Sequence, residues 1–277
     1  MIKAGHVRAR KCAWRLEAGL MPWKRQRHGV EKLMIQDEQA TQTATDDEDG
    51  VHFIFRRVNT ETGRLTLEEV FSLRFRVYCL ERGFLPAGQY PDGKESDEYD
   101  DISTHFTAFS RSNQLAGTVR LILPCDDRPF PYELHCRALY DHLELPPRSE
   151  CGEVSRLIVD KNYHRRRGDT PEGVSEEILN SNDPIKPVKR QQDNSERRIS
   201  TPEIVLGLYR QMYHYALETG IRYWYAAMER SLARVLSRLG FNFNPIGLET
   251  DYYGPVTPYL ADLREIERAL DANNPEL

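Results

Sequence analysis

The sequence lacks several features that would assign it to a class of proteins directly. No apolar run approaches the roughly 20 residues that a membrane helix needs, and no continuous apolar stretch near the N-terminus is typical of a secretory signal. The 5 cysteines are odd in number and include no Cys-x-x-Cys pair, which argues against a disulfide framework and a zinc ribbon. We therefore expect a cytoplasmic protein with reduced thiols and no bound metal.

The composition is that of a globular protein. With 277 residues, of which 39% are hydrophobic and 29% charged, the chain is long enough to bury a normal core. Its net charge of -5 conceals a basic segment at residues 1–32 and an acidic one at residues 37–50. Neither segment has the apolar pattern of a fold, so we predict an N-terminal arm over residues 1–50 and one domain over residues 51–277. The basic charge is compatible with weak contact with an anionic membrane surface, and we expect no nucleic-acid partner.

The domain mixes patterns of both secondary structures. Helical periodicity and terminating glycines predict three helices, at residues 65–83, 200–220 and 229–240. A fourth helical pattern lies near the C-terminus, at residues 259–270. Alternating or continuous apolar runs predict strands at residues 52–58, 105–111, 115–124, 151–160 and 221–228. Residues 168–199 have few large apolar side chains, and we treat them as a mobile insertion. The mixture of hairpins and helices predicts an α/β fold in the loose sense, or α+β.

Charged residues interrupt several of the apolar segments. Arg74 shares a helix face with Leu67 and Val70, Arg120 lies within TVRLIL, and EVSRLIV contains both Glu153 and Arg156. Because a buried charge without a partner is costly, these arginines require carboxylates. The run ESDEYDD at residues 95–101 can supply them. The convergence predicts either a polar pocket or a structural network of ion pairs.

Four segments carry a resemblance to a known family. RFRVYCLERGF, ESDEYD, GTVRLIL and EVSRLIV, at residues 74–84, 95–100, 117–123 and 153–159, resemble the ordered signatures of the acyl-homoserine-lactone synthases of the GNAT superfamily. The later segments AAMERSLARVLSRLGF and YYGPVTPYLADL look more like the long-chain N-acyl amino acid synthases and the acyltransferases associated with the PEP-CTERM/exosortase system. The resemblance covers roughly residues 52–265. It implies a GNAT-like fold, with a mixed, mostly antiparallel sheet, splayed strands and helices on both faces.

The resemblance also implies which residues form the site. The expected catalytic residues are Glu95, Asp97, Asp100, Arg120, Glu153, Ser155 and Arg156. Arg74, Tyr78 and Phe84 are expected to bind substrate, although Phe84 replaces the Trp that is usual in lactone synthases. Glu95 is our first choice for the group that deprotonates the acceptor amine through water. Trp224 lines either an acyl channel, as a substrate-binding residue, or the plain core, together with Tyr209, Met212, Tyr213, Tyr215 and Tyr225.

The implied reaction is transfer of a long-chain fatty acyl group from the thioester of acyl carrier protein to the amine of an amino acid. No cofactor is expected, since the acyl-phosphopantetheine of the carrier protein is the donor substrate. Arg165, Arg166 and Arg167 form either a docking site for the acidic carrier protein or a solvated basic turn. Three alternatives remain: a lactone synthase that uses S-adenosylmethionine, an acyl-CoA-dependent GNAT acetyltransferase, and a non-enzymatic binding protein on the same fold.

Overall fold

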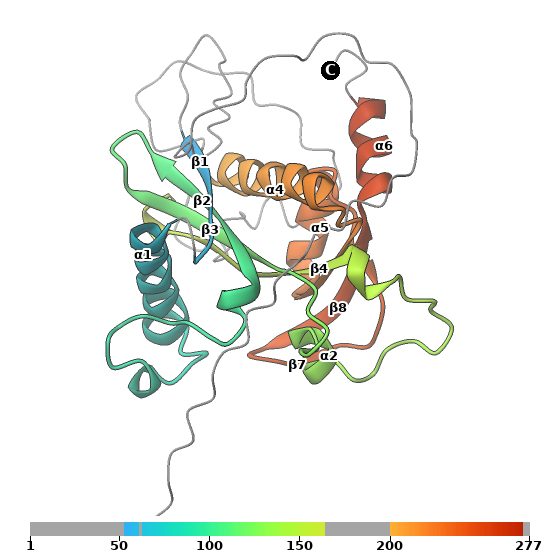
Figure 1. The fold of residues 1–277 in the computed structure, drawn as a ribbon, viewed down its shortest axis with the longest axis horizontal. Helices are drawn as coiled ribbons and strands as arrows, with labels where there is room; N and C mark the ends of the chain where they lie inside the picture. Colours follow the sequence, from blue (N-terminus) through green and yellow to red (C-terminus); the bar gives the residue numbers. More distant parts are fainter. Residues whose placement is uncertain (1–52, 61–62, 164–199, 274–277) are drawn as a thin grey trace, which may run out of the picture. The chain divides into compact units, whose positions relative to one another are not determined.

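A single mixed sheet organises the domain in the computed structural model, which describes residues 53–60, 63–163 and 200–273. The strand order is β1-β2-β3-β4-β5-β8-β6, with β7 paired to β8 (Figure 1). Only β4 and β5 pair in parallel among the described strands; the other pairs are antiparallel. The strands are β1 (Phe53–Val58), β2 (Ser103–Ser110), β3 (Leu115–Ile122), β4 (Cys151–Val159), β5 (Tyr223–Met228), β6 (Asn244–Pro245), β7 (Thr250–Asp251) and β8 (Pro255–Asp262). The predicted fold class is confirmed.

The central strands β3 and β4 have two different faces. Because side chains alternate along a strand, Val119, Leu121 and Val154 point into the main apolar core, while Arg120 and Glu153 point to the other face. Both charged side chains are buried, with relative exposures of 1% and 2%. One face of the sheet therefore carries the main core, and the other carries these buried charges beside two smaller apolar clusters.

Helix α4 (Ser200–Thr219) covers the apolar face and packs against β1 to β4 (Figure 1). Its core residues include Ile204, Leu208 and Met212, each 0% exposed. The close approach depends on Gly207, since a Cβ there would lie 2.0 Å from Cζ of Phe55 on β1. The predicted helix is confirmed, although its N-terminal side chains lie outside the described residues.

Helix α1 (Arg64–Phe75) lies on the opposite face, where Leu73 and Val77 pack against Ile158 of β4. The helix continues into a π-helical turn, η1 (Arg76–Glu81), and Gly83 follows with φ of 65°. Such turns are rare and often occur at functional sites. This one was not predicted, because the apolar spacing of the segment fits an ordinary helix.

The C-terminal prediction was partly wrong. Tyr259–Asp262 belong to β8, and the final helix α6 begins only after them (Leu263–Asn273). The leucines and isoleucines here fit a helical repeat, but β8 pairs with β5 along its length and buries Tyr259 and Ala261 in the main core. Tertiary pairing therefore overrides the local pattern. Helices α5 (Arg230–Arg238) and α2 (Pro131–His135) complete the named α-helices of the described chain.

The parallel pair β4–β5 separates after three residues. Cys151–Glu153 pair with Tyr223–Tyr225, and beyond Glu153 the two strands no longer pair. A bulge adds to the distortion, because Arg120 of β3 lies opposite Ser155 while Thr118 lies opposite Ile158. Within the bulge, Arg156 has φ of 54°, an unusual conformation for a residue other than glycine. The expected splay between the segments EVSRLIV and YWYAAM is present.

Among the helices of the described ranges, none is both long and apolar enough to cross a bilayer. The predicted arm (residues 1–50), the predicted insertion (168–199) and Arg165–Arg167 lie outside the described residues.

Candidate active site

The acidic loop folds back onto Arg74 of α1. The guanidinium of Arg74 donates to Glu95 through Nε and to Asp100 through Nη1, at 2.7 Å in the second case. Arg74 and Glu95 are both 0% exposed, so their charges are withdrawn from water. Pairing with ionised partners is the condition under which a buried arginine is tolerated.

The same loop binds Arg120 of β3. Nη1 of Arg120 donates to Asp97 at 2.5 Å and to Asp100 at 2.8 Å, and Nε donates to the hydroxyl of Ser155 at 3.0 Å. Asp100 therefore accepts from both Arg74 and Arg120. One carboxylate thereby joins the first helix to the centre of the sheet.

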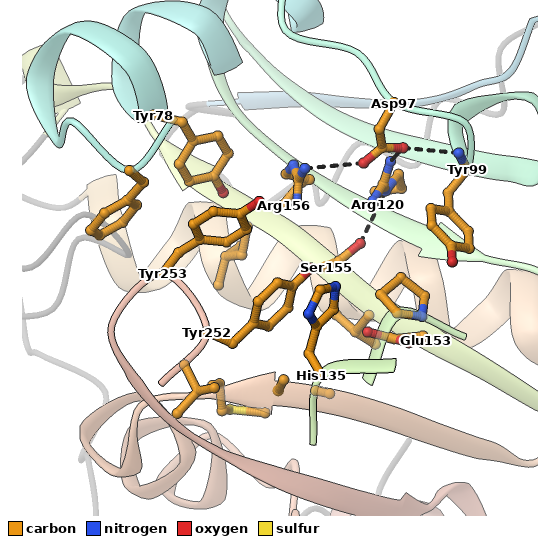
Figure 2. A pocket seen from close by; sticks show the side chains of 18 of the residues that line it. Tyr78, Asp97, Tyr99, Arg120, His135, Glu153, Ser155, Arg156, Tyr252 and Tyr253 are labelled. Atoms are coloured by element: carbon orange, nitrogen blue, oxygen red, sulfur yellow. Dashed lines mark hydrogen bonds and ion pairs between the residues drawn. The ribbon is translucent and has the colours of Figure 1, made fainter. Parts of the chain in front are cut away.

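Arg156 completes the network from the bulge of β4. It donates to Glu95 at 2.9 Å and to Asp97 at 3.0 Å through Nη2. Its guanidinium also lies over the ring of Tyr78, 5.4 Å from the centroid. The sequence prediction that three arginines meet the acidic loop is confirmed in space, and Figure 2 shows Asp97 between Arg120 and Arg156.

Arg120 and Arg156 each have one terminal nitrogen that remains unused, as does the buried Arg74 at Nη2. Arg120 bonds through Nε and Nη1, and Arg156 through Nε and Nη2. Within the described part of the chain, Nη2 of Arg120 and Nη1 of Arg156 make no hydrogen bond, and both side chains line the cavity described below. The pair offers two cationic donors to a ligand.

Two carboxylates of the network, Glu95 and Asp100, are held in the ionised form. Burial opposes ionisation of Glu95, but the charges of Arg74 and Arg156 outweigh burial and lower its pKa to about 2. Burial likewise opposes ionisation of Asp100, whose pKa is nevertheless lowered by Arg74 and Arg120. Neighbouring His105 stays neutral, since burial and the charge of Arg74 lower its pKa to about 3.

Glu153 has the opposite electrostatic environment. Burial raises its pKa to about 8, although the backbone N–H of Tyr132 donates to its Oε2 at 3.1 Å and Arg120 also favours the charged form. No side chain of the described residues forms an ion pair with it. A carboxyl group that changes protonation near neutral pH and lines a cavity is suited to proton transfer.

A cavity of about 390 Å³ adjoins these groups. This volume lies within the roughly 300–1,000 Å³ of small-molecule sites. Its charged wall includes Asp97, Glu98, Arg120, Glu153 and Arg156 beside the hydroxyl of Ser155, and Glu229 is a further charged residue of the lining. Its aromatic wall includes Tyr78, Tyr252, Tyr253 and His135, which Figure 2 labels, together with Phe84 and Tyr90. Its remaining lining is largely apolar and includes Val154, Leu157, Tyr209, Ala226, Met228 and Leu232.

The aromatic wall was only half predicted. Tyr78 and Phe84 stack with centroids 6.3 Å apart, as the sequence led us to expect of a shared wall. Tyr252 and His135 were missed, and their rings stack with centroids 3.9 Å apart. The dipeptide Tyr252-Tyr253 before Gly254 could have indicated this wall, because two aromatic residues in a turn do not pack in a core and often mark a binding site.

Several predicted residues lie behind the cavity instead of on its wall. Arg74, Glu95 and Asp100 do not line it, and they orient Arg120 and Arg156 from behind. Trp224 is 0% exposed and packs in the main core against Tyr209 and Phe241, so the assignment of Trp224 to substrate binding is wrong. Among the described residues, no cluster of His, Cys, Asp or Glu has the arrangement of a metal site.

Comparison with known proteins matches this geometry to a family. Residues 73–171 match the family model of the acetyltransferase (GNAT) domain. The chain contains a GNAT acyltransferase domain. The matched range includes the whole charged network, from Arg74 to Arg156. The GNAT domain makes this protein an acyltransferase.

Relatives of this GNAT domain include lactone synthases. An acyl-homoserine-lactone synthase of Aeromonas salmonicida is 27% identical over 180 residues, which are 65% of this chain and 70% of that protein. Among solved structures, the lactone synthase LasI has a TM-score of 0.54 at 16% identity and covers 80% of this chain and 96% of its own. The CoA-dependent lactone synthase BjaI, solved with SAM and isopentyl-CoA, has a TM-score of 0.52 at 20% identity, with coverage of 78% and 87%. The structural likenesses show a shared fold.

Proposed function

We propose that the protein transfers a long-chain fatty acyl group from an acyl carrier protein thioester to the amine of an amino acid, which yields an N-acyl amino acid. One observation carries the proposal. A single cavity joins a charged site on one face of the sheet to an apolar end on the other face. The product of this reaction has the same two parts, a charged head and an apolar tail.

The acceptor's carboxylate is bound by the unused nitrogens of Arg120 and Arg156. Both arginines are fixed by the acidic loop, so little side-chain freedom is lost when they bind a ligand. Guanidinium donors suit a carboxylate because they offer short, charge-assisted hydrogen bonds. The acceptor's ammonium group then extends toward Glu153, which lines the same cavity.

Glu153 removes the proton from the acceptor's ammonium group. Glu95, our first choice from the sequence, is 0% exposed, does not line the cavity and is held ionised by two arginines. A carboxylate with a pKa of about 2 is a weak base, whereas Glu153, with a pKa of about 8, matches an α-amino group that titrates near ~8. We therefore move this role from Glu95 to Glu153.

The chemical step then balances as follows. The ammonium N–H bond breaks, its proton passes to the Glu153 carboxylate, and the amine nitrogen attacks the thioester carbon. The oxyanion of the tetrahedral intermediate accepts hydrogen bonds from backbone N–H groups at the gap between β4 and β5. The C–S bond then breaks, and the departing thiolate takes the proton held by Glu153. The nitrogen loses its second proton to the Glu153 carboxylate, which passes it to water as the neutral amide forms.

Helix α5 supports a carrier-protein donor. Its Arg230 and Arg234 are exposed and lie four residues apart, which places them on the same side of the helix. The helix begins directly after Glu229, which lines the cavity, and Leu232 of its first turn lines it too. A basic helix beside the cavity suits an acidic carrier protein, because opposite charges accelerate and orient docking. The predicted docking residues Arg165–Arg167 stay a prediction.

A lactone synthase that uses S-adenosylmethionine is the second candidate. The relative from Aeromonas salmonicida favours it, and the aromatic wall at Tyr78 and Tyr252 also suits a sulfonium cation. Phe84 stands where lactone synthases usually have Trp, which is one reason to prefer an amino acid acceptor. The resemblance to N-acyl amino acid synthases and to PEP-CTERM-associated acyltransferases stays a prediction.

The deciding experiment supplies donor and acceptor separately. Purified protein is incubated with a fatty acyl carrier protein or the matching acyl-CoA, and with either a mixture of amino acids or S-adenosylmethionine. We expect mass spectrometry to detect an N-acyl amino acid, with the carrier-protein donor preferred. An acyl-homoserine lactone as the sole product would establish the second candidate, and preference for acyl-CoA would overturn the donor assignment. Absence of any product with all four pairs would support a binding protein.

A further inference from the structure

The cavity passes through the sheet at the gap between β4 and β5. Arg120 and Glu153 lie on the charged face. Val154 and Leu157, which also line the cavity, belong to the apolar cluster on the face that α4 covers. Side chains of both faces can line one cavity because the two strands stop pairing after Glu153 and Tyr225. A fatty acyl chain whose thioester lies at the charged wall therefore has a path toward α4.

Tyr209 stands at the α4 side of this path. Among the described residues of α4, it is the one that lines the cavity, and it is only 1% exposed. Its ring packs against Trp224 and Phe241, with centroid separations of 6.0 Å and 5.0 Å, and against Phe243 at 6.5 Å. These aromatic neighbours restrict movement of the ring away from the cavity, because a close-packed interior has few voids into which a side chain can move.

We propose that Tyr209 is a specificity-determining residue that sets the longest acyl chain the protein accepts. The inference rests on the proposed acyl transfer and deepens it, since it names the group that ends the acyl channel. A chain that reaches the ring must displace a packed core residue to extend further. Such overpacking is costly, so longer chains are rejected.

Substitutions at Tyr209 test the proposal through the chain length of the product. The substrate is an equal mixture of acyl carrier protein thioesters from octanoyl to stearoyl, and products are counted by mass spectrometry. We expect Tyr209→Ala and the milder Tyr209→Leu to move the preferred chain toward greater length, by roughly four carbons for Ala, because a phenol ring fills about that volume. Tyr209→Trp is expected to move it toward shorter chains. An unchanged distribution in the Ala and Leu variants would overturn the proposal.

Met212→Ala is the matched control. Met212 lies three residues further along α4, is 0% exposed and does not line the cavity. Its truncation is expected to lower the melting temperature as Tyr209→Leu does, while the product distribution stays that of the unmodified protein. A shift in chain length as large as that of Tyr209→Ala would show that core loosening, and not the channel end, controls selection.

A binding measurement separates this proposal from the proposed reaction. Non-hydrolysable acyl-pantetheine thioethers of increasing length are titrated against the unmodified protein and Tyr209→Leu, with the melting temperature as the readout. We expect the longest stabilising thioether to be longer for the variant. If no acyl product forms but this difference is observed, the proposed reaction is wrong, and the proposal that Tyr209 limits the length of a bound acyl chain is supported. If product forms but both proteins prefer the same length, the role of Tyr209 fails alone.

Discussion

Two glutamates of the site show how the surroundings of one residue type decide its chemistry. Glu95 accepts hydrogen bonds from two arginines, and Glu153 accepts a backbone hydrogen bond from Tyr132. Both are buried, but paired charges lower the pKa of Glu95 to about 2, whereas burial raises that of Glu153 to about 8. Environments that drive two carboxyl pKa values apart assign them different roles. In the proposed reaction, Glu95 orients the arginines and Glu153 exchanges protons with the acceptor.

Replacement of each glutamate by glutamine separates these roles. Glu153→Gln keeps the shape of the side chain and removes the base, so we expect kcat to fall by about 10²–10⁴ with the fold intact. In the unmodified protein, kcat/KM should fall as the pH drops below about 8, because Glu153 becomes protonated. In the variant, kcat/KM should fall less steeply over the same pH range, because no carboxylate is present to be protonated at this position. The acceptor amine titrates in both proteins, so the difference between the two pH profiles is the measurement. Equal rates in the two proteins would remove Glu153 from the mechanism.

Glu95→Gln should instead reduce stability. The amide removes the negative charge that pairs with Arg74 and Arg156. Removal of one partner of a buried ion pair lowers the free energy of unfolding by about 3–5 kcal/mol. Urea unfolding measures this loss. If Glu95→Gln kept full stability and lost only kcat, Glu95 would be the proton acceptor after all.

Much of the charged site could be predicted from the sequence. Arginines inside apolar segments need partners, and the ESDEYDD run held enough carboxylates to supply them. The division of roles between Glu95 and Glu153 could not be predicted, because it depends on which side chain faces the cavity and which faces two guanidinium groups. The position of Trp224 was ambiguous for the same reason, since aromatic spacing is alike in channels and cores.

The secondary structure shows the same limit of local patterns. The hairpin β2–β3 and helix α4 were predicted because alternation and capping signals are local. Strand β8 was mistaken for helix at Tyr259–Asp262, where pairing with β5 decides the conformation. The π-helical turn at Arg76–Glu81 was also missed, although it carries Tyr78 into the cavity wall. Features fixed by distant contacts leave little trace in a short window of sequence.

Helix α5 provides a test of carrier-protein docking. We expect the double variant Arg230→Glu/Arg234→Glu to raise KM for the carrier-protein donor by about tenfold or more, because like charges replace opposite ones at the docking surface. The rate with a short acyl-pantetheine thioester should be unchanged. Arg64→Glu is the control, since Arg64 is 90% exposed at the start of α1. Equal losses with both donors would place these arginines in the chemistry or the fold, and no loss with either would exclude α5 from docking.

The stability of the domain should depend on pH in two opposite directions. The lowered pKa of Glu95 contributes stability above its usual 4.5, and this contribution is lost as the pH falls toward about 2. The raised pKa of Glu153 contributes stability below about 4.5, and this contribution is lost as the pH rises through about 8. Calorimetry at a series of pH values should therefore find a melting temperature that declines on both sides of about pH 5. Glu153→Gln should flatten the decline on the alkaline side; a decline of the same steepness would show that other groups cause it.

The passage between β4 and β5 has a kinetic consequence for the proposed reaction. A product whose head is held at Arg120 while its tail extends through the sheet toward Tyr209 is bordered by paired strands on two sides, β3–β4 and β5–β8. Each additional methylene of the tail buries more apolar surface, so we expect the finished molecule to leave the enzyme more slowly as its acyl chain lengthens.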